Sequence, residues 1–497
     1  MGILPGYLVG GGSIMADVVL FFPKSSFIEA AMKHQYPPTA LLSLAVHLDS
    51  RYRVKIIDQR TDSQWKRHLQ QELKKGPICV GFSSYTGEQI NFALEATRYV
   101  KNNSDVPVVW GGVHPTILPR QTLENRSIDF VVKGEGEETF PELVMALEKQ
   151  KNISGVRGVL YKRNGTIKEN APRPPIDLNN LPELPYHLVD MRKYIVRFNN
   201  RRVLSFEASR GCVNRCAFCF IQNLGQQRLW RALTPERTIE RIRDLKERFH
   251  VEGIEFQDYN FFVDLARSKR IMQLMLKEKL DVFWMACARI NNVMRMDRSY
   301  LRLIEKSGNT RFALGVESGS DRILRLIKKD ITVKQVLAAS KKLSRTKIPP
   351  FYSLMQGFPT ETEAELRMTV GLALRLLREN SRAKISIIHC YRPLPGNELF
   401  DLCVNHGLKA PSSLEEWGKY DMTAVGFPWL SQKRRKQVRA INFLSLFVDR
   451  KFEEVESKTV WAFSAMYRPI ALRRLKKFNF SLMLAPTLKD LYVRVKQ

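Results

Sequence analysis

The chain is organised around residues 209–219, which read SRGCVNRCAFC. The cysteines Cys212, Cys216 and Cys219 have the spacing Cys-x3-Cys-x2-Cys, so one short loop can wrap a metal cluster. Thiolates hold iron–sulfur clusters, normally four per cubane, and three local cysteines with no evident fourth leave one iron open to a chelating ligand. The loop follows an apolar strand predicted over residues 203–206. It should therefore lie at the carboxyl end of a strand, where α/β folds place their active sites.

This motif, placed after a strand that opens an α/β barrel, resembles that of the radical S-adenosylmethionine (SAM) superfamily. The resemblance implies a [4Fe-4S] cluster whose open iron binds the amino and carboxylate groups of SAM. One electron then cleaves SAM to methionine and a 5′-deoxyadenosyl radical. The alternatives are a zinc site or chance clustering. Zinc sites usually collect four ligands, and the other cysteines, Cys79, Cys287, Cys390 and Cys403, are scattered singly.

The composition sets broad limits. A chain of 497 residues suggests two to four domains, and a hydrophobic content of 44% suffices for packed cores. Seven cysteines in this length do not indicate a disulfide framework. Together with the absence of an apolar run of about 18 residues, this favours the cytoplasm, with peripheral attachment to the inner face of the membrane as an extension. Residues 1–15 are interpreted as a flexible leader, with Met15 as an alternative start.

The net charge of +30 implies attraction to something anionic. Nucleic acid, a membrane surface and acidic metabolites all satisfy that condition, so the charge alone does not choose among them.

Residues 16–170 alternate strands with helices, which predicts a doubly wound, parallel, Rossmann-like sheet. The hairpin predicted at its end turns at Asn164-Gly165, and the proline-rich residues 171–198 are interpreted as a linker between domains. The predicted strands are 17–22, 54–57, 78–82, 106–110 and 128–132, the helices 39–48, 63–75, 87–102 and 137–149, and the hairpin 156–167.

The loops after the third, fourth and fifth strands should meet at the carboxyl edge of this sheet. This set of loops resembles the cobalamin-binding domain ahead of the barrel in class B radical SAM enzymes. The residues that the resemblance assigns to cobalamin are Ser83, Ser84, Thr86, Gly111, Gly112, His114, Gly134, Glu135 and Gly136.

One departure concerns the cobalt. Methionine-synthase-like domains carry Asp-x-His-x-x-Gly after the first strand, whereas residues 23–27 here read PKSSF. The resemblance therefore implies cobalamin bound without a histidine ligand, and His114 is interpreted as a residue that packs within its loop. The alternative is a degenerate Rossmann domain that no longer binds cobalamin.

Residues 199–410 predict six β/α units, which resemble the partial barrel of the radical SAM superfamily. The predicted strands are 203–206, 254–257, 283–286, 312–316, 352–356 and 385–389, and the helices are 234–248, 264–279, 297–307, 320–328, 332–346 and 361–379.

The ends of these strands carry the residues that the resemblance places around SAM. Glu317 and Ser318 should contact the ribose or the amino group of SAM, and Arg289 should face its carboxylate or the substrate. Phe218 should lie near the adenine. Glu317 could instead be an acid at a helix N-terminus, and Arg289 a structural ion-pair partner. The complete set assigned to SAM is Phe218, Asp258, Arg289, Glu317, Ser318 and Gly357.

Residues 411–497 predict a basic, mainly helical region. A helix should begin at residues 433–436 and run through Ala440, Leu444, Phe447 and Phe452, and residues 467–478 mix basic with apolar side chains. The favoured interpretation is a helix packed on the barrel with a solvated basic face. Contact with an anionic membrane surface is the second, and nucleic acid is the last.

These resemblances lead to one main functional hypothesis, a cobalamin-dependent radical SAM methyltransferase. It would place a methyl group on an unactivated carbon of a small molecule, of lipid-like or tetrapyrrole character. Cobalamin would be reloaded with methyl from a second SAM, and flavodoxin or ferredoxin would supply electrons.

Three alternatives remain. An oxidative cyclase or rearrangement enzyme would use the same parts. A tRNA-modifying methylthiotransferase ranks lower, because such enzymes carry extra N-terminal cysteines and Cys79 is the only cysteine before residue 212. A catalytically silent binding protein conflicts with the intact spacing of the three cysteines.

Overall fold

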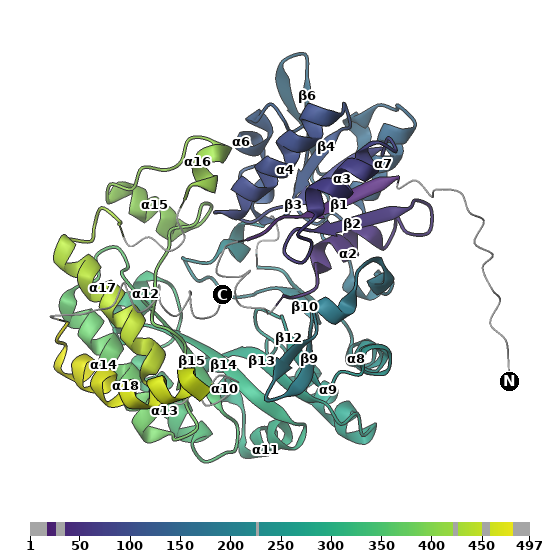
Figure 1. Ribbon diagram of the computed structural model, residues 1–497. Coiled ribbons are helices and arrows are strands. Elements are labelled where there is room, and N and C mark those ends of the chain that lie inside the picture. The colour runs from purple at the N-terminus through teal and green to yellow at the C-terminus, as the bar shows by residue number, and fades with distance from the viewer. Residues whose placement is uncertain (1–16, 26–34, 225–227, 421–425, 450–457, 481–497) are drawn as a thin grey trace.

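The computed structural model describes residues 17–25, 35–224, 228–420, 426–449 and 458–480 (Figure 1). The leader and Phe452 lie outside these described residues. Two sheets organise the chain. The N-terminal sheet lies above the half-open barrel in Figure 1, and helices of the C-terminal region lie beside both.

The N-terminal sheet has seven strands in the order β2-β1-β3-β4-β5-β6-β7, and β1 to β5 are parallel. The central strands β1 and β3 are buried along their whole length, which explains the unbroken apolar run of β1. The predicted doubly wound sheet and its hairpin are confirmed. The strands are β1 (Val18–Phe22), β2 (Val54–Asp58), β3 (Cys79–Ser83), β4 (Val108–Gly111), β5 (Phe130–Val132), β6 (Val159–Arg163) and β7 (Thr166–Glu169).

Helices cover both faces of this sheet. Helix α7 packs closely on β3, since a Cβ on Gly81 would lie 3.0 Å from the side chains of Leu20 and Phe140. Two short helices after Gly112, α5 and α6, were not predicted, because the sequence there was interpreted as a loop. The helices are α2 (Thr39–Ala45), α3 (Trp65–Leu73), α4 (Gln89–Asn103), α5 (Val113–Ile117), α6 (Pro119–Glu124) and α7 (Thr139–Glu148).

The second sheet is the partial barrel. Its strand order is β16-β15-β14-β13-β12-β9-β8, with β17 paired to β15. All of its strands except β8 pair in parallel. The predicted six units are confirmed, although the sixth strand is broken into two short pieces. The strands are β8 (Val196–Phe198), β9 (Arg201–Phe206), β12 (Gly253–Phe256), β13 (Phe283–Arg289), β14 (Asn309–Glu317), β15 (Pro350–Gln356), β16 (Lys384–Ile385) and β17 (His389–Cys390).

The helices of the barrel follow the predicted order. A small antiparallel pair, β10 (Ser209–Gly211) with β11 (Trp230–Ala232), flanks the cysteine loop and was not predicted. Helix α10 was also not predicted. The helices are α8 (Pro235–Phe249), α9 (Leu265–Lys277), α10 (Ile290–Arg295), α11 (Arg298–Lys306), α12 (Asp321–Leu326), α13 (Val333–Leu343) and α14 (Glu363–Glu379).

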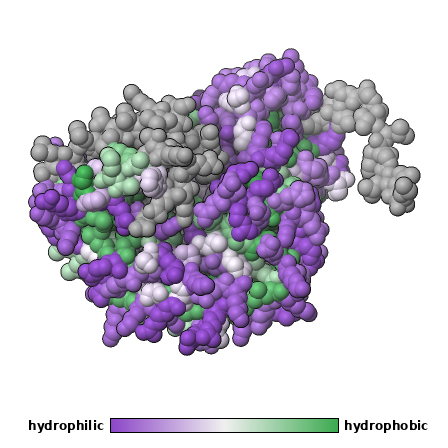
Figure 2. Space-filling model, turned by 60° about the horizontal axis from the view of Figure 1, so that its bottom comes forward, coloured by the Kyte–Doolittle hydropathy of each residue, from purple (hydrophilic) through white to green (hydrophobic). Residues whose placement is uncertain are grey.

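The C-terminal region divides its contacts between the two sheets. Helix α16 packs against α4 of the N-terminal domain, whereas α17 and α18 pack near α14 of the barrel (Figure 1). Among the residues described, no helix is both long and apolar enough to cross a membrane. Figure 2 shows one face of the molecule, covered mainly by hydrophilic residues. The helices are α15 (Glu398–Asn405), α16 (Leu414–Gly418), α17 (Gln432–Leu444) and α18 (Lys458–Lys477).

Candidate active site

A cavity of about 250 Å³ lies where the two sheets face each other. One wall comes from the loops after β3, β4 and β5, and the other comes from the residues around β10 and from Tyr259. The structure therefore brings the loops predicted to bind cobalamin to the same cavity as the start of the cysteine loop. Six of the nine residues predicted for cobalamin line it: Ser83, Gly111, Gly112, Gly134, Glu135 and Gly136.

The cysteine loop is held in place by backbone contacts with neighbouring elements. Ala217, between Cys216 and Cys219, donates its N–H to the carbonyl of Ile327 at 2.9 Å and accepts from the N–H of Leu399 at 3.0 Å. Gly211 has a φ of +83°, and a Cβ there would lie 1.9 Å from the carbonyl oxygen of Leu229. The bend into the loop thus requires glycine.

The cysteines have surroundings that fit an iron–sulfur cluster. Arg289 donates to the sulfur of Cys216 at 3.1 Å, and the Asn214 amide donates to that of Cys212 at 3.2 Å. Such donors stabilise thiolates. Burial raises the pKa of Cys219 to about 11, and the nearby Cys216 and Cys212 add to the shift. Binding of a cluster would therefore have to displace a proton from this thiol.

No group of three His, Cys, Asp or Glu side chains in the described ranges is spaced to hold a single metal ion. A cubane has irons and sulfides between its thiolates, so its ligands stand further apart than those of one ion.

Asp258 lies at the root of the cysteine loop. Its buried carboxylate accepts from the N–H of Ala208 at 3.1 Å and from the hydroxyl of Ser209. Burial raises the pKa of Asp258 to about 6, although these two hydrogen bonds act in the opposite direction. In this structure the carboxylate anchors the strand that leads into the loop, and a contact with SAM stays a prediction.

Lys329 joins three of the residues predicted to surround SAM, and sequence reasoning missed it. Its ammonium lies 2.6 Å from the Glu317 carboxylate, and both side chains are less than 10% exposed. It also lies 5.8 Å from the centre of the Phe218 ring, and its carbonyl accepts from Arg289. Glu317, Arg289 and Phe218 therefore form one network around a buried lysine.

The side chain of Ser318 contacts helix α14. Its hydroxyl lies 3.2 Å from that of Thr369 and accepts from the N–H of Ser320 at 3.1 Å. The side chain is fully buried, so the structure gives Ser318 a packing role, and its predicted contact with SAM stays a prediction.

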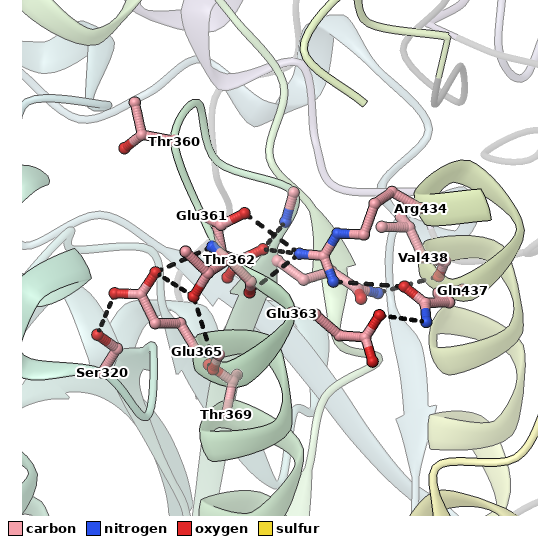
Figure 3. A network of polar contacts seen from close by, with 12 residues as sticks. Ser320, Thr360, Glu361, Thr362, Glu363, Glu365, Thr369, Arg434, Gln437 and Val438 are labelled. Carbon is pink, nitrogen blue, oxygen red and sulfur yellow. Dashed lines mark hydrogen bonds and ion pairs between the residues drawn. The ribbon is translucent and has the colours of Figure 1, made fainter. Parts of the chain in front are cut away.

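Gly357 is held by a polar network at the end of β15, of which Figure 3 shows Glu361 and Arg434. Its N–H donates to Glu361 Oε2 at 2.7 Å, and Arg434 of α17 lies 3.6 Å from the same oxygen. Its carbonyl accepts from the Trp429 indole at 3.0 Å. Two residues of the C-terminal region, Trp429 and Arg434, thus hold a turn that was predicted to contact SAM.

The other carboxylate oxygen of Glu361, Oε1, is buried and has no hydrogen-bond partner among the described residues. Burial raises the pKa of Glu361 from its ordinary value of 4.5 to about 7. A raised pKa means that the folded state binds the proton more tightly than the unfolded state. Stability from this group is therefore highest at low pH and declines as the pH rises from about 4.5 to about 7.

We expect Glu361→Gln to remove that pH dependence. As the pH rises from 4.5 to 8, wild type should lose about 3 kcal/mol of unfolding free energy relative to the variant. Urea denaturation at a series of pH values measures it. Glu363→Gln is the matched control, because a hydrogen bond from Arg367 lowers the pKa of Glu363 to about 2, below this range. A constant difference for Glu361→Gln would contradict the prediction.

The loop after β4 explains why Gly112 is glycine. Its φ is +95°, and a Cβ there would lie 2.8 Å from the hydroxyl of Ser83. The loop after β4 therefore packs directly against the residues at the end of β3, where only glycine fits.

His114, Ser84 and Thr86 are the three predicted cobalamin residues that do not line the cavity. His114 donates its backbone N–H to the Ser84 carbonyl at 3.0 Å, and its Nδ1 lies 3.0 Å from the Thr86 hydroxyl. Its ring packs edge-on against Trp417 of α16 at 5.9 Å. Burial lowers the pKa of His114 to about 3, so the ring is neutral. These contacts agree with the interpretation of His114 as a packing residue.

Comparisons with known proteins match both halves of this site. The family model described as Radical SAM superfamily matches residues 206–373, and the model described as B12 binding domain matches residues 26–144. An uncharacterised methyltransferase of Pyrococcus horikoshii is 32% identical over 413 residues, covering 82% of this chain and 86% of that protein. The chain therefore belongs to the cobalamin-dependent radical SAM enzymes, a family that includes methyltransferases.

Two further similarities support the fold and the range of activities. An anaerobic magnesium-protoporphyrin IX monomethyl ester cyclase of Synechocystis is 27% identical over 322 residues, covering 63% of each chain. The solved structure of OxsB, a cobalamin-dependent SAM radical enzyme, has a TM-score of 0.73 at 17% identity, covering 97% of this chain and 75% of OxsB. The cofactors of the family are those predicted from the sequence: a [4Fe-4S] cluster, SAM and cobalamin.

Proposed function

We propose that this protein transfers a methyl group to an unactivated carbon of a small molecule. The observation that carries the proposal is the shared cavity, whose walls come from the loops predicted for cobalamin and from the start of the cysteine loop. A methyl donor on one wall and a radical source on the other could act on opposite sides of one substrate. The match to a methyltransferase along most of the chain supports the same reaction.

The residues would divide the work as follows. Cys212, Cys216 and Cys219 would hold the cluster, with Arg289 stabilising a thiolate and Asp258 fixing the strand before the loop. When bound, the cluster and SAM supply a hydrogen-abstracting radical, and cobalamin supplies the methyl group. The contribution of the protein is to position these groups and to exclude water.

The lining of the cavity supports the substrate class that we propose. Apolar side chains, including Phe82, Val132 and Phe140, form much of its wall beside the glycine loops. These favour a substrate or cofactor with an extended apolar surface, in keeping with a lipid-like or tetrapyrrole substrate. The similarity to a tetrapyrrole cyclase supports this class, and it also makes oxidative cyclisation the second candidate function.

One anaerobic assay distinguishes the two reactions. We expect reconstituted protein with SAM, reductant, hydroxocobalamin and a candidate substrate to form both S-adenosylhomocysteine and 5′-deoxyadenosine. The first product reports methyl loading of cobalamin, and the second reports hydrogen abstraction. Formation of 5′-deoxyadenosine with no S-adenosylhomocysteine would contradict methylation and favour the cyclase.

The partners of this reaction include an electron donor of the flavodoxin or ferredoxin kind, and we propose an anionic membrane surface as a further one. Helix α18 packs inward through Ala471 and Leu475, while Met466 on the outer side is 74% exposed. Arg473 and Lys477 are exposed on its last turns. Such a combination of apolar and basic side chains suits the interface of an anionic bilayer.

We expect the protein to float with anionic phospholipid vesicles and not with zwitterionic ones. Met466→Glu should weaken flotation, because it removes an apolar contact and adds repulsion. Met368→Glu is the matched control, since Met368 is exposed on α14. Equal flotation of both variants and wild type would contradict contact through α18.

A further inference from the structure

Five charged side chains form one cluster, here called the ion cluster, at the wall of the cavity. Two of its members belong to the loop after β5, and the other three lie around β10 and β11. Arg210 is two residues before Cys212, so the ion cluster joins a loop of the N-terminal domain to the cysteine loop. Its members are Glu135, Glu137, Glu207, Arg210 and Arg231.

Arg210 holds carboxylates from both domains. Its Nη1 lies 2.6 Å from Glu137 Oε1 and 3.4 Å from Glu135 Oε1, and its Nε lies 2.8 Å from Glu207 Oε2. The Arg210 side chain is only 17% exposed. Ion pairs this well shielded from solvent depend on the exact placement of both partners.

Arg231 of β11 also forms a salt bridge with the loop after β5. It lies 2.7 Å and 3.0 Å from the two oxygens of Glu135, which also accepts from the N–H of Ile176 at 2.9 Å. Arg210 and Arg231 are cross-strand partners in the pair β10 and β11. Two like charges in that position would repel each other, and the Glu135 carboxylate between them offsets the repulsion.

Glu135 therefore contacts both the cavity and the strands next to the cysteine loop. It lines the cavity beside Gly134 and Gly136, and its carboxylate is bound by both arginines of the β10–β11 pair. A molecule that fills the cavity contacts the loop 134–137, and Arg210 links that loop to the cysteine loop. The link consists of the salt bridges of Arg210 with Glu135 and Glu137, followed by two residues of chain.

We propose that Glu135 and Arg210 are positioning residues that couple occupancy of the cavity to the placement of the cysteine loop. The inference rests on the proposed function only in naming a corrinoid as the occupant. Coupling of this kind is reciprocal, so a ligand that orders the loop 134–137 also orders residues 208–219.

Hydrogen exchange of the full chain, with its cluster reconstituted anaerobically, tests this proposal, and hydroxocobalamin is the probe. In wild type we expect hydroxocobalamin to slow amide exchange about tenfold both in residues 134–137 and in residues 208–219. In Glu135→Gln, the protection of residues 208–219 should be reduced but not abolished, because the ion pair between Glu137 and Arg210 remains. Iron content should remain at the wild-type level, which separates lost coupling from lost folding.

Two further variants complete the experiment. Glu138→Gln is the matched control, because Glu138 is paired with Arg173 and not with Arg210, and it should behave as wild type. Arg210→Lys keeps the charge and loses the fork that reaches several carboxylates, so it should retain part of the protection. It also serves as the test if Glu135→Gln does not fold.

The possible failures are distinguishable. If wild type shows no protection at residues 134–137 and retains no corrinoid after gel filtration, the proposed function fails and this inference fails with it. If the corrinoid binds and protects residues 134–137, but residues 208–219 respond equally in wild type and in Glu135→Gln, the coupling alone is overturned.

Discussion

Replacing Cys216 with alanine is expected to abolish both the iron–sulfur absorbance and the reductive cleavage of SAM, while corrinoid absorption bands remain. Cys216 is the buried member of the triad and accepts a hydrogen bond from Arg289. Two remaining cysteines cannot hold a cubane that already lacks a fourth protein ligand. The glycine loops of the N-terminal domain lie on the other wall of the cavity, so corrinoid binding should survive.

Iron and cobalt analysis with visible spectra of anaerobically purified protein measures this outcome. Cys287→Ala is the matched control, because Cys287 lies on β13 outside the cysteine loop and should leave the iron content unchanged. Zinc in place of iron in wild type, or a full cluster in Cys216→Ala, would refute the assignment of the triad.

Replacing Lys329 with methionine should destabilise the protein by about 3–5 kcal/mol, because the buried Glu317 carboxylate is left without its partner. The pair is enclosed on the other side by Gly315, where a Cβ would lie 2.4 Å from Glu317 Oε1. Water has little room to replace the ammonium. The same change removes the cation beside Phe218 and should weaken SAM binding.

The double variant Glu317→Gln/Lys329→Met separates these effects. It removes both charges, so most of the lost stability should return, while SAM binding stays weak. Urea denaturation and equilibrium dialysis with SAM give the two measurements. If the single variant is as stable as wild type, the ion pair does not contribute as the geometry indicates.

The larger elements of the fold were predictable because their patterns are local. The strand β1 is an unbroken apolar run, and α14 begins with the capping pair Thr362 and Glu365, followed by a long amphipathic stretch. The pair β10 and β11 escaped prediction since each strand has three residues and its partner lies about twenty residues away. The break between β16 and β17 was likewise not predictable, because the apolar pattern of residues 385–389 is that of one continuous strand.

The candidate site was predictable to the level of loops, and less so to the level of contacts. The positions of Glu317, Arg289 and Glu135 at strand ends followed from the sequence. Their partners did not, because Arg231 is 96 residues from Glu135 and no local spacing encodes that pair. The sequence marks Lys329 only as a basic residue that follows a short helix. Basic residues are common at helix C-termini, so this position did not indicate a partner for Glu317.

The packing of α16 on the N-terminal domain has a consequence for how the protein is made. Leu414 and Trp417 belong to the same hydrophobic core as Phe21 and Trp110, more than 300 residues earlier. During synthesis the first sheet leaves the ribosome long before the helix that completes its core. The surface around His114 stays uncovered until α16 has been made, so the core of the first sheet is completed only after the barrel strands have been synthesised.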